Sequence, residues 1–562
     1  MRFKENNLML VILGNPPYCV KSKNNNEYIL NLIKAYRAIE GNPLKDVSTA
    51  LNDDYVKFIR FAENKIENLD EGLLGIVSNN GYLDNVTFRG MRYHLLKTFD
   101  EIYILNLHGN KRKKEKTDDG QKDENVFDIM VGVAIAVFIK YKEKEKKKKL
   151  ATIYYSSLKG KSEEKYNFLE TNNIYTTKFE KIVYKEPYYF FTKKDFSNEN
   201  FYNKGVSLID IFIVYGTGLI TNNDKLAIDY SKDELLAKLK YLAYLKEKNY
   251  CSKYGVEKDN RYCRLKEIQE FLKFTNVDEN YIKQVTYKPF DNRFTYYSKS
   301  KGVIVRSAYN VLKHMLEIKN NIALLSTRTI TLSEFKHVFV VNNIVTQNVF
   351  SVCTYVFPLY IKQDQDIFED NLKENFKNSF RNFINTKYGR EFNAEEILGY
   401  IYAVLNSNVY RIRFYEFLKI QHPKIIFVDS VSVFERISKL GTDLINSHLL
   451  KNSVELDGNI GKHYEESIEN SDQKVDKIVY EKETQKLFYN QTCFFKKTPI
   501  EVYEYMIGDQ QVLRSYLLCR KGRKLNIYEI KYLEKVIKIL NYTIEKQKEI
   551  DKIISDSSEF GI

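Results

Sequence analysis

The chain has 562 residues, 43% of them hydrophobic and 14% aromatic, with 88 Lys and Arg against 74 Asp and Glu. This hydrophobic content excludes a disordered protein, and the length predicts about three or four domains of ordinary size. The net charge of +14 favours a polyanionic partner such as nucleic acid. The six cysteines are scattered without a CxxC pair, which argues against a disulfide framework and a zinc site.

The longest apolar stretch, 130–139, is far shorter than the roughly 20 residues that span a bilayer. The N-terminus has no apolar segment followed by a cleavage site of small residues. Together with the unpaired cysteines, these features predict a cytoplasmic protein without a membrane partner.

The first 150 residues alternate between strand and helix patterns, which predicts an α/β sheet with helices on its faces. The expected elements are strand 8–13, helices 27–39 and 53–66, strand 72–78, helix 88–98, and strands 101–107 and 130–140. Between the last two strands, the charged segment 108–125 favours equally a solvated hairpin loop and a segment that closes over nucleic acid. The charged run 142–149 predicts a linker that ends this region.

The most informative motif is Asn15-Pro16-Pro17-Tyr18, which closes the apolar run 8–14. The Asn15 amide oxygen and the Pro16 carbonyl can accept hydrogen bonds from an exocyclic amino group, and Tyr18 offers a face for stacking an extruded base. Proline has a fixed φ and no N–H, so the pair holds the turn rigid and leaves both acceptors free. The motif suits a site that makes the N6 amino group of adenine nucleophilic toward a methyl donor. The alternative is a Pro-Pro turn after an ordinary core strand.

From about residue 154 the pattern changes to aromatic-rich, strand-like segments such as 185–191, together with helices. The stretch 214–224 has the Gly and Asn density of a recognition loop and includes Thr221 and Asn222. These two residues are therefore candidates for contacts with a nucleic acid.

Arg293, Arg306 and Arg328 stand among aromatic and β-branched residues, which suits phosphate contacts and base-edge readout. The alternative for each arginine is an ordinary surface position on a mixed α/β domain. The region from about residue 393 begins with a helix and ends in an amphipathic helix, 527–551, which is expected to pack rather than to act.

Six stretches in order along the chain carry a family resemblance. They are VILGNPPY at 11–18, YLDNVTFRGMR at 82–92, DENVFD at 123–128 before GVA at 132–134, KPFDNRF at 288–294, YAVLNS at 402–407 and RKGR at 520–523. The chain thereby resembles the γ-order N6-adenine DNA methyltransferases, in particular the methyltransferase and target-recognition portion of single-chain type ISP restriction–modification enzymes. The stretches span nearly the whole chain.

The resemblance implies the C-terminal half of a Rossmann-like methyltransferase sheet in 1–150. It implies a mixed α/β DNA target-recognition domain in 151–392 and a helical or mixed part of the specificity region in 393–562. The implied activity is site-specific N6 methylation of a flipped adenine in double-stranded DNA, with S-adenosylmethionine as methyl donor. Asn15, Pro16, Pro17 and Tyr18 would be the catalytic residues, and no metal site is expected.

The chain departs from the family pattern in one respect. In this family the NPPY strand is the fourth of its sheet, and earlier strands carry the glycine-rich turn that cradles S-adenosylmethionine. Here only residues 1–7 precede the strand, and no GxxxxGK[ST] loop is present. We therefore expect an upstream polypeptide to carry the cofactor-binding, helicase and nuclease parts. The alternatives are a non-catalytic DNA-binding specificity subunit and, with less support, a methyltransferase acting on RNA or protein glutamine.

Overall fold

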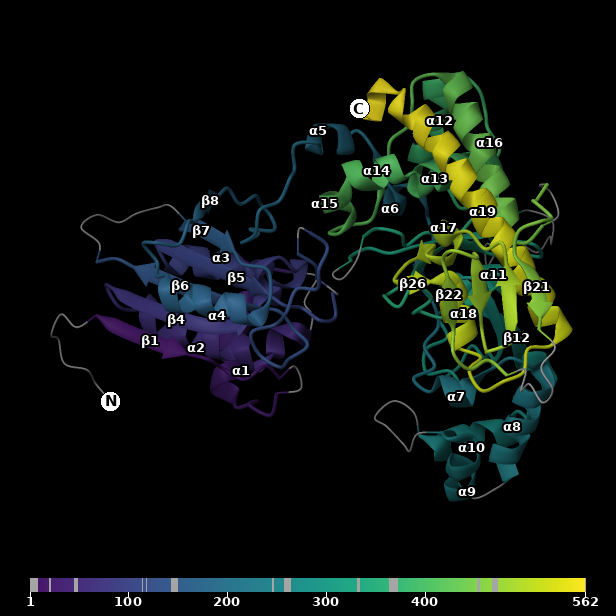
Figure 1. The fold of residues 1–562 in the computed structure, drawn as a ribbon, viewed down its shortest axis with the longest axis horizontal. Helices are drawn as coiled ribbons and strands as arrows, with labels where there is room; N and C mark the ends of the chain where they lie inside the picture. The colour runs from purple at the N-terminus through teal and green to yellow at the C-terminus, as the bar shows by residue number, and fades with distance from the viewer. Residues whose placement is uncertain are drawn as a thin grey trace. The chain divides into compact units, whose positions relative to one another are not determined.

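The computed structural model describes residues 9–19, 22–44, 49–113, 115–117, 119–142, 150–244, 247–256, 264–330, 334–362, 372–451, 455–466 and 474–560. The chain forms two compact units, Met1–Asp195 and Phe196–Ile562, called unit 1 and unit 2 below (Figure 1). Among the described residues, no helix is both long and apolar enough to cross a membrane.

Unit 1 is built on a six-stranded sheet with the order β1-β4-β6-β5-β7-β8. Its strands are β1 (Leu10–Gly14), β4 (Gly72–Asn79), β5 (Glu101–His108), β6 (Val133–Lys140), β7 (Thr152–Ser157) and β8 (Glu180–Ile182). Strands β1, β4, β5 and β7 run parallel, whereas β6 and β8 run antiparallel to them. The carboxyl ends of the four parallel strands therefore meet at one edge, where open α/β sheets bind their ligands.

The remaining elements of unit 1 are α1 (Glu27–Ile33), α2 (Asp54–Glu67), α3 (Arg89–Thr98), α4 (Ser162–Thr171), the short strands β2 (Ala38–Ile39) and β3 (Asn42–Pro43), and 3-10 turns. Helix α2 buries Tyr55, Ile59, Ala62 and Ile66, which recur at helical spacing on one face. Strand β4 alternates buried and half-buried residues, as expected for a strand.

The predicted fold class, an α/β sheet followed by a mixed α/β region with a helical C-terminal part, is confirmed. The helix expected at 27–39 ends earlier, at Ile33, because the chain turns through a 3-10 segment into β2. Unit 1 also extends past the boundary expected at 150, because β7 pairs with β5 over six residues and thus belongs to the same sheet. Of the charged run 142–149, all but Lys142 lies outside the described residues.

Unit 2 contains, among its described residues, three four-stranded sheets with the orders β10-β17-β14-β15, β11-β13-β12-β16 and β21-β24-β23-β22. The strands are β9 (Val206–Ser207), β10 (Gly216–Thr217), β11 (Ile228–Asp229), β12 (Ile282–Lys288), β13 (Asp291–Tyr296), β14 (Ala323–Ser326), β15 (Phe339–Val341), β16 (Ile344–Val345), β17 (Tyr355–Pro358), β18 (Tyr360–Ile361), β19 (Lys373–Glu374), β20 (Lys424–Ile425), β21 (Lys462–Glu465), β22 (Val479–Glu481), β23 (Lys486–Phe488), β24 (Cys493–Lys496), β25 (Met506–Ile507) and β26 (Gln510–Gln511).

The helices of unit 2 are α5 (Glu199–Tyr202), α6 (Leu208–Ile211), α7 (Asp224–Ala227), α8 (Lys232–Tyr244), α9 (Glu247–Tyr254), α10 (Leu265–Phe274), α11 (Tyr309–Glu317), α12 (Asn378–Tyr388), α13 (Ala394–Asn406), α14 (Asn408–Arg413), α15 (Tyr415–Leu418), α16 (Val431–His448), α17 (Ile500–Tyr503), α18 (Val512–Leu518) and α19 (Ile527–Ser555). Helices α13 and α16 pack closely at Gly399 and Gly441, where only glycine fits. A Cβ on Gly441 would lie 1.8 Å from the Gly399 carbonyl oxygen. One hydrophobic core extends from Tyr202 to Phe560, so the parts expected at 151–392 and 393–562 pack together.

The core of unit 2 contains a histidine that burial keeps neutral. His448 is hydrogen-bonded to the Tyr402 hydroxyl at 2.6 Å and to the Thr543 hydroxyl at 2.9 Å. Burial lowers the pKa of His448 to about 3. The unfolded chain binds a proton at this residue below a pH of about 6.5, whereas the folded chain does not, so acid favours unfolding.

We expect the unfolding free energy of unit 2 to fall by about 2 kcal/mol from pH 7 to pH 5 because of His448 alone. Denaturant titrations at the two pH values measure this change. The variant His448→Gln cannot take up the proton and should show a smaller pH dependence. An unchanged pH dependence in the variant would rule out this role for His448.

Candidate functional site

The Asn15–Tyr18 motif lies directly after β1, at the carboxyl edge of the unit 1 sheet (Figure 1). Asn15 and Pro17 are exposed, Pro16 is buried and Tyr18 is half-buried. The Asn15 side chain has no hydrogen-bond partner among the described residues. Its amide is therefore free to meet a ligand at this edge.

The Tyr18 side chain is held by packing of its ring and not through its hydroxyl. The ring packs edge-on against Tyr55, with centroids 6.3 Å apart and an interplanar angle of 89°. The hydroxyl is buried and, among the described residues, has no hydrogen-bond partner. Burial also raises the pKa of Tyr18 to about 12, so the residue stays neutral.

The N-terminal end of α2 fixes the chain that follows the motif. The Asp53 carboxylate accepts a hydrogen bond from the Cys19 backbone N–H at 2.8 Å. The fully buried Lys57 donates to the Ser22 hydroxyl at 2.8 Å and to the Asn24 carbonyl at 2.6 Å. These contacts hold the motif in place without using its own polar atoms.

The neighbouring turns at this edge are held by hydrogen bonds within the protein. The Asn80 amide donates to the Asn106 side chain at 3.0 Å, and its backbone N–H donates to Gly132 O at 3.0 Å. Strand β4 leads into Asn80-Gly81 and β5 into His108-Gly109, so neither turn is the glycine-rich strand–turn–helix that holds S-adenosylmethionine. The described residues of unit 1 thus place Asn15 and Tyr18 beside two turns that lack the glycine-rich pattern.

The charged segment 108–125 is anchored at its end by a buried ion pair. Lys165 on α4 lies 2.9 Å from the Asp123 carboxylate, and both side chains are fully buried. Asp123 also accepts hydrogen bonds from the backbone N–H groups of Gly109 and Gly160. The segment thus returns to a fixed point beside the sheet, which its sequence alone does not reveal.

Lys165→Met should destabilise unit 1 by about 3–5 kcal/mol, because it leaves the Asp123 carboxylate buried without a countercharge. Denaturant unfolding followed by circular dichroism measures the loss. Lys181→Met is the matched control, since the Lys181 side chain on β8 is exposed. Equal stability of the two variants would contradict the anchoring role.

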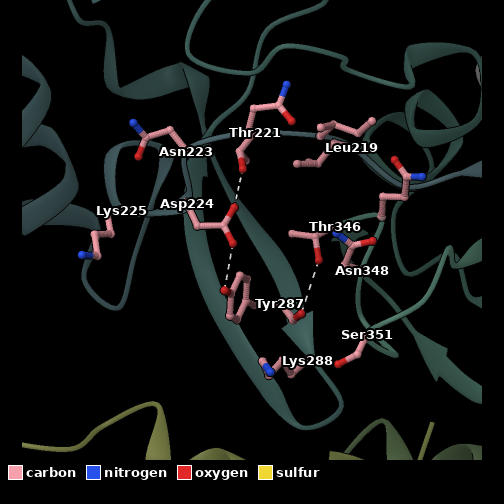
Figure 2. A pocket seen from close by; sticks show the side chains of 13 residues that line it. Leu219, Thr221, Asn223, Asp224, Lys225, Tyr287, Lys288, Thr346, Asn348 and Ser351 are labelled. Atoms are coloured by element: carbon pink, nitrogen blue, oxygen red, sulfur yellow. Dashed lines mark hydrogen bonds between the residues drawn. The ribbon is translucent and has the colours of Figure 1, made fainter. Parts of the chain in front are cut away.

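Unit 2 contains a polar pocket of about 700 Å³, called the recognition pocket below (Figure 2). Its wall comes from three segments: 219–225, 287–288 and 346–351. The lining residues are Leu219, Ile220, Thr221, Asn222, Asn223, Asp224, Lys225, Tyr287, Lys288, Thr346, Gln347, Asn348 and Ser351. The sequence-predicted Thr221 and Asn222 thus lie together in this pocket.

The glycine and asparagine content of 214–224 has a structural cause. Gly218 lies so close to the neighbouring strand that a Cβ would approach the Thr346 carbonyl to 2.6 Å. Asn222 has a left-handed φ of 55°, which asparagine tolerates better than most residues. The Asn223 side chain caps α7 by accepting a hydrogen bond from Leu226 N–H.

Asp224 is the one carboxylate among the lining residues, and both its oxygens are used. One accepts a hydrogen bond from the Thr221 hydroxyl, and the other accepts from the Tyr287 hydroxyl at 2.8 Å (Figure 2). Burial raises the pKa of Tyr287, so its hydroxyl stays protonated and can donate. Lys225 and Lys288 supply positive charge at the same wall.

Arg293 backs the recognition pocket instead of lining it. Its guanidinium lies 3.9 Å from the Tyr287 ring centroid and 4.4 Å from that of Tyr230, and it pairs with Asp291 at 2.6 Å. Asp291 also binds Arg520 at 3.0 Å, which ties the C-terminal segment to β13. The Arg293 side chain is only 11% exposed, so the described fold uses it for packing.

Arg306 and Arg328 are connected to the recognition pocket through a series of residue contacts. Exposed Arg306 donates to the Gln347 side chain at 3.0 Å and to the Thr217 hydroxyl at 2.6 Å. Thr217 pairs with Tyr355 between β10 and β17. Arg328 interacts with Tyr355 and partly offsets the rise in pKa of Tyr355 that burial causes.

The structure therefore brings Thr221, Asn222, Arg306 and Arg328 into one continuous region. Sequence reasoning missed the partner segment, 346–351, and its support from Gln510. The Gln510 amide donates to Val349 O at 2.7 Å and to the Ser351 hydroxyl at 3.1 Å. The polar pair Gln347-Asn348 after the apolar stretches 338–341 and 344–345 was the available signal for this segment.

The model of the Type ISP C-terminal specificity domain family matches residues 210–550. Three solved structures share the fold over 97% of this chain. They are the cryoEM structure of the DrdV–DNA complex (21% identity, TM-score 0.73, 56% of that chain covered), the ATP-dependent Type ISP restriction–modification enzyme LlaBIII bound to DNA (22%, 0.73, 37%), and a nuclease-deletion mutant of the Type ISP restriction–modification enzyme LlaGI with a DNA substrate mimic (20%, 0.70, 52%). The chain thus spans between 37% and 56% of their lengths. No curated protein matches it significantly in sequence.

Proposed function

The chain belongs to the family of Type ISP C-terminal specificity domains, and from this premise we propose that unit 2 recognises a specific sequence in double-stranded DNA. The recognition pocket carries the proposal. It is polar, it is flanked by lysines and by Arg306, and its one carboxylate is fully hydrogen-bonded. Such a lining suits phosphate contacts beside base-edge readout.

Unit 1 would supply the adenine-holding part of an N6-adenine DNA methyltransferase. Asn15 and the Pro16 carbonyl would accept hydrogen bonds from the N6 amino group, and Tyr18 would stack on the extruded base. These acceptors stabilise the positive charge that develops on N6, because they are already in place when it forms. S-adenosylmethionine would donate the methyl group when its site is complete.

An upstream polypeptide would complete that site and carry the helicase and nuclease parts. Strand β1 is an edge of the unit 1 sheet, and among the described residues no strand pairs with its outer edge. Met9, Val11 and Leu13 expose 53%, 47% and 76% of their surfaces. The free edge is suited to receive a further strand of the same sheet, and the exposed apolar side chains are suited to packing against a further element on that face.

The second candidate is a non-catalytic DNA-binding specificity subunit of a restriction–modification enzyme. The family match favours it, because residues 210–550 lie in unit 2 and do not include Asn15–Tyr18. The two candidates differ in one measurable respect. Addition of an upstream methyltransferase half should restore adenine methylation in the first case and not in the second.

Selection of bound duplexes from a randomised pool tests the recognition role directly. The full chain should enrich a defined sequence. Exchange of unit 2 for that of a relative with another site should transfer the relative's preference. Equal retention of all sequences by the wild-type chain would rule out the target-recognition role.

A further inference from the structure

We propose that Asn222 and Asn348 each read the major-groove edge of an adenine in the target duplex. The inference rests on the proposed recognition of DNA by unit 2 and specifies which base the recognition pocket reads. Both residues are exposed and lie on different segments of the pocket wall.

Two amides of the pocket wall are uncommitted. Among the described residues, neither the Asn222 nor the Asn348 side chain has a hydrogen-bond partner. The other amides are engaged: Asn223 caps α7, and Gln347 accepts from Arg306 and donates to the Cys353 sulfur at 3.3 Å. Asn222 and Asn348 are therefore the amides left for a ligand.

An amide side chain selects adenine because its two ends match the adenine edge. The amide oxygen accepts from the N6 amino group while the amide nitrogen donates to N7, whereas guanine offers two acceptors and suits Arg or Lys. Two of the three nearby cations have hydrogen-bond partners, and the third, Lys288, lies with its ammonium 6.0 Å from the Tyr287 ring centroid. Arg306 binds Thr217 and Gln347, and Lys225 donates to Gly255 O at 3.2 Å.

Both amides are held on fixed backbone, which sharpens discrimination between bases. Asn222 occupies a left-handed conformation next to Thr221, whose hydroxyl is bound to Asp224. Asn348 begins the turn that Gln510 holds through Val349 O. Because the backbone is fixed, only the side-chain rotamers lose entropy on binding, and a mismatched base costs the amide its hydrogen bonds.

The test uses the full chain, a randomised duplex pool and two variants with matched controls. Asn222→Gly removes the amide but keeps a residue that tolerates the left-handed φ, and Asn348→Ala removes the second amide. The first control is Asn320→Gly, because Asn320 is also exposed, has a φ of 60° and lies outside the pocket lining. The second control is Asn342→Ala, since Asn342 is exposed and likewise outside the lining.

Each pocket variant should lose preference for adenine at one position of the site by about 5- to 150-fold, with the other positions unchanged. The controls should keep the wild-type profile. Asn222→Asp, which retains the shape but only accepts, should shift that position toward cytosine. The Asn222→Asp variant still tests the assignment if Asn222→Gly fails to fold.

The outcomes separate the inference from the proposed function. An unchanged profile in the pocket variants, with a clear wild-type site, overturns the adenine assignment and leaves recognition by unit 2 standing. Loss of preference at a guanine or pyrimidine position in Asn222→Gly or Asn348→Ala also overturns it. A wild-type chain without any sequence preference overturns both.

Discussion

Asn15→Ala should abolish adenine methylation by the completed enzyme, by about 100-fold or more, and leave duplex binding near the wild-type level. The amide has no described partner inside the protein, so its loss removes a contact to the extruded base rather than a fold contact. Removal of one preorganised group that stabilises developing charge typically costs a factor of this size. Methyl incorporation into duplex DNA and a parallel binding titration give the two values.

The control for this variant is Asn68→Ala, because Asn68 is exposed at the end of α2 and distant in sequence from the motif. Tyr18 variants add a second check. Tyr18→Phe should be mild and Tyr18→Ala damaging, because the hydroxyl has no hydrogen-bond partner among the described residues and the ring would do the stacking. Equal damage from both exchanges would show that the hydroxyl matters and that the stacking role is misassigned.

The affinity of the full chain for duplex DNA should fall steeply with salt. The net charge is +14, and each Lys or Arg that neutralises a phosphate releases a counterion. The logarithm of the affinity should therefore fall linearly with the logarithm of salt, with a slope of roughly −0.9 per phosphate contact. Between 50 and 200 mM salt, about 6–10 contacts would lower the affinity by about 10³- to 10⁵-fold. Binding titrations at several salt concentrations measure the slope.

Arginine variants show which residues contribute to this salt dependence. Arg328→Ala should make the slope shallower by about one contact if Arg328 binds a phosphate. Arg293→Ala should instead lower the stability of unit 2, because its guanidinium is packed between Tyr230 and Tyr287 and paired with Asp291. An affinity of the wild-type chain for duplex DNA that does not change with salt would contradict its proposed binding to nucleic acid.

Much of the fold of unit 1 could be predicted, because its elements are long and their apolar residues repeat regularly. The strand expected at 72–78 is β4, which ends one residue later, and the helix expected at 53–66 is α2, with both ends shifted by one residue. The extent of the sheet was harder to predict. The sequence of strand β7 has little periodic pattern of its own. The strand is defined by its pairing with β5, which joins residues about 50 positions apart.

The recognition pocket illustrates the same limit at the level of a site. Gly218 and Asn222 mark an unusual backbone in the sequence, because few other residues fit a close strand contact or a left-handed φ. The sequence does not reveal that 346–351 forms the facing wall or that Gln510 supports it. These contacts join distant segments and leave no periodic trace.

The sequence by itself determined the α/β character of the first region, the Asn15–Tyr18 motif after a strand and the family resemblance, because each depends on residues close together in the chain. The tertiary structure decided what the arginines do. Arg293 and Arg306 have similar sequence surroundings, yet one is packed between two tyrosines and the other is exposed at the recognition pocket. A guanidinium can serve equally in an internal ion pair or on a surface, and only the position of its partners, here Asp291 and Gln347, selects between the two.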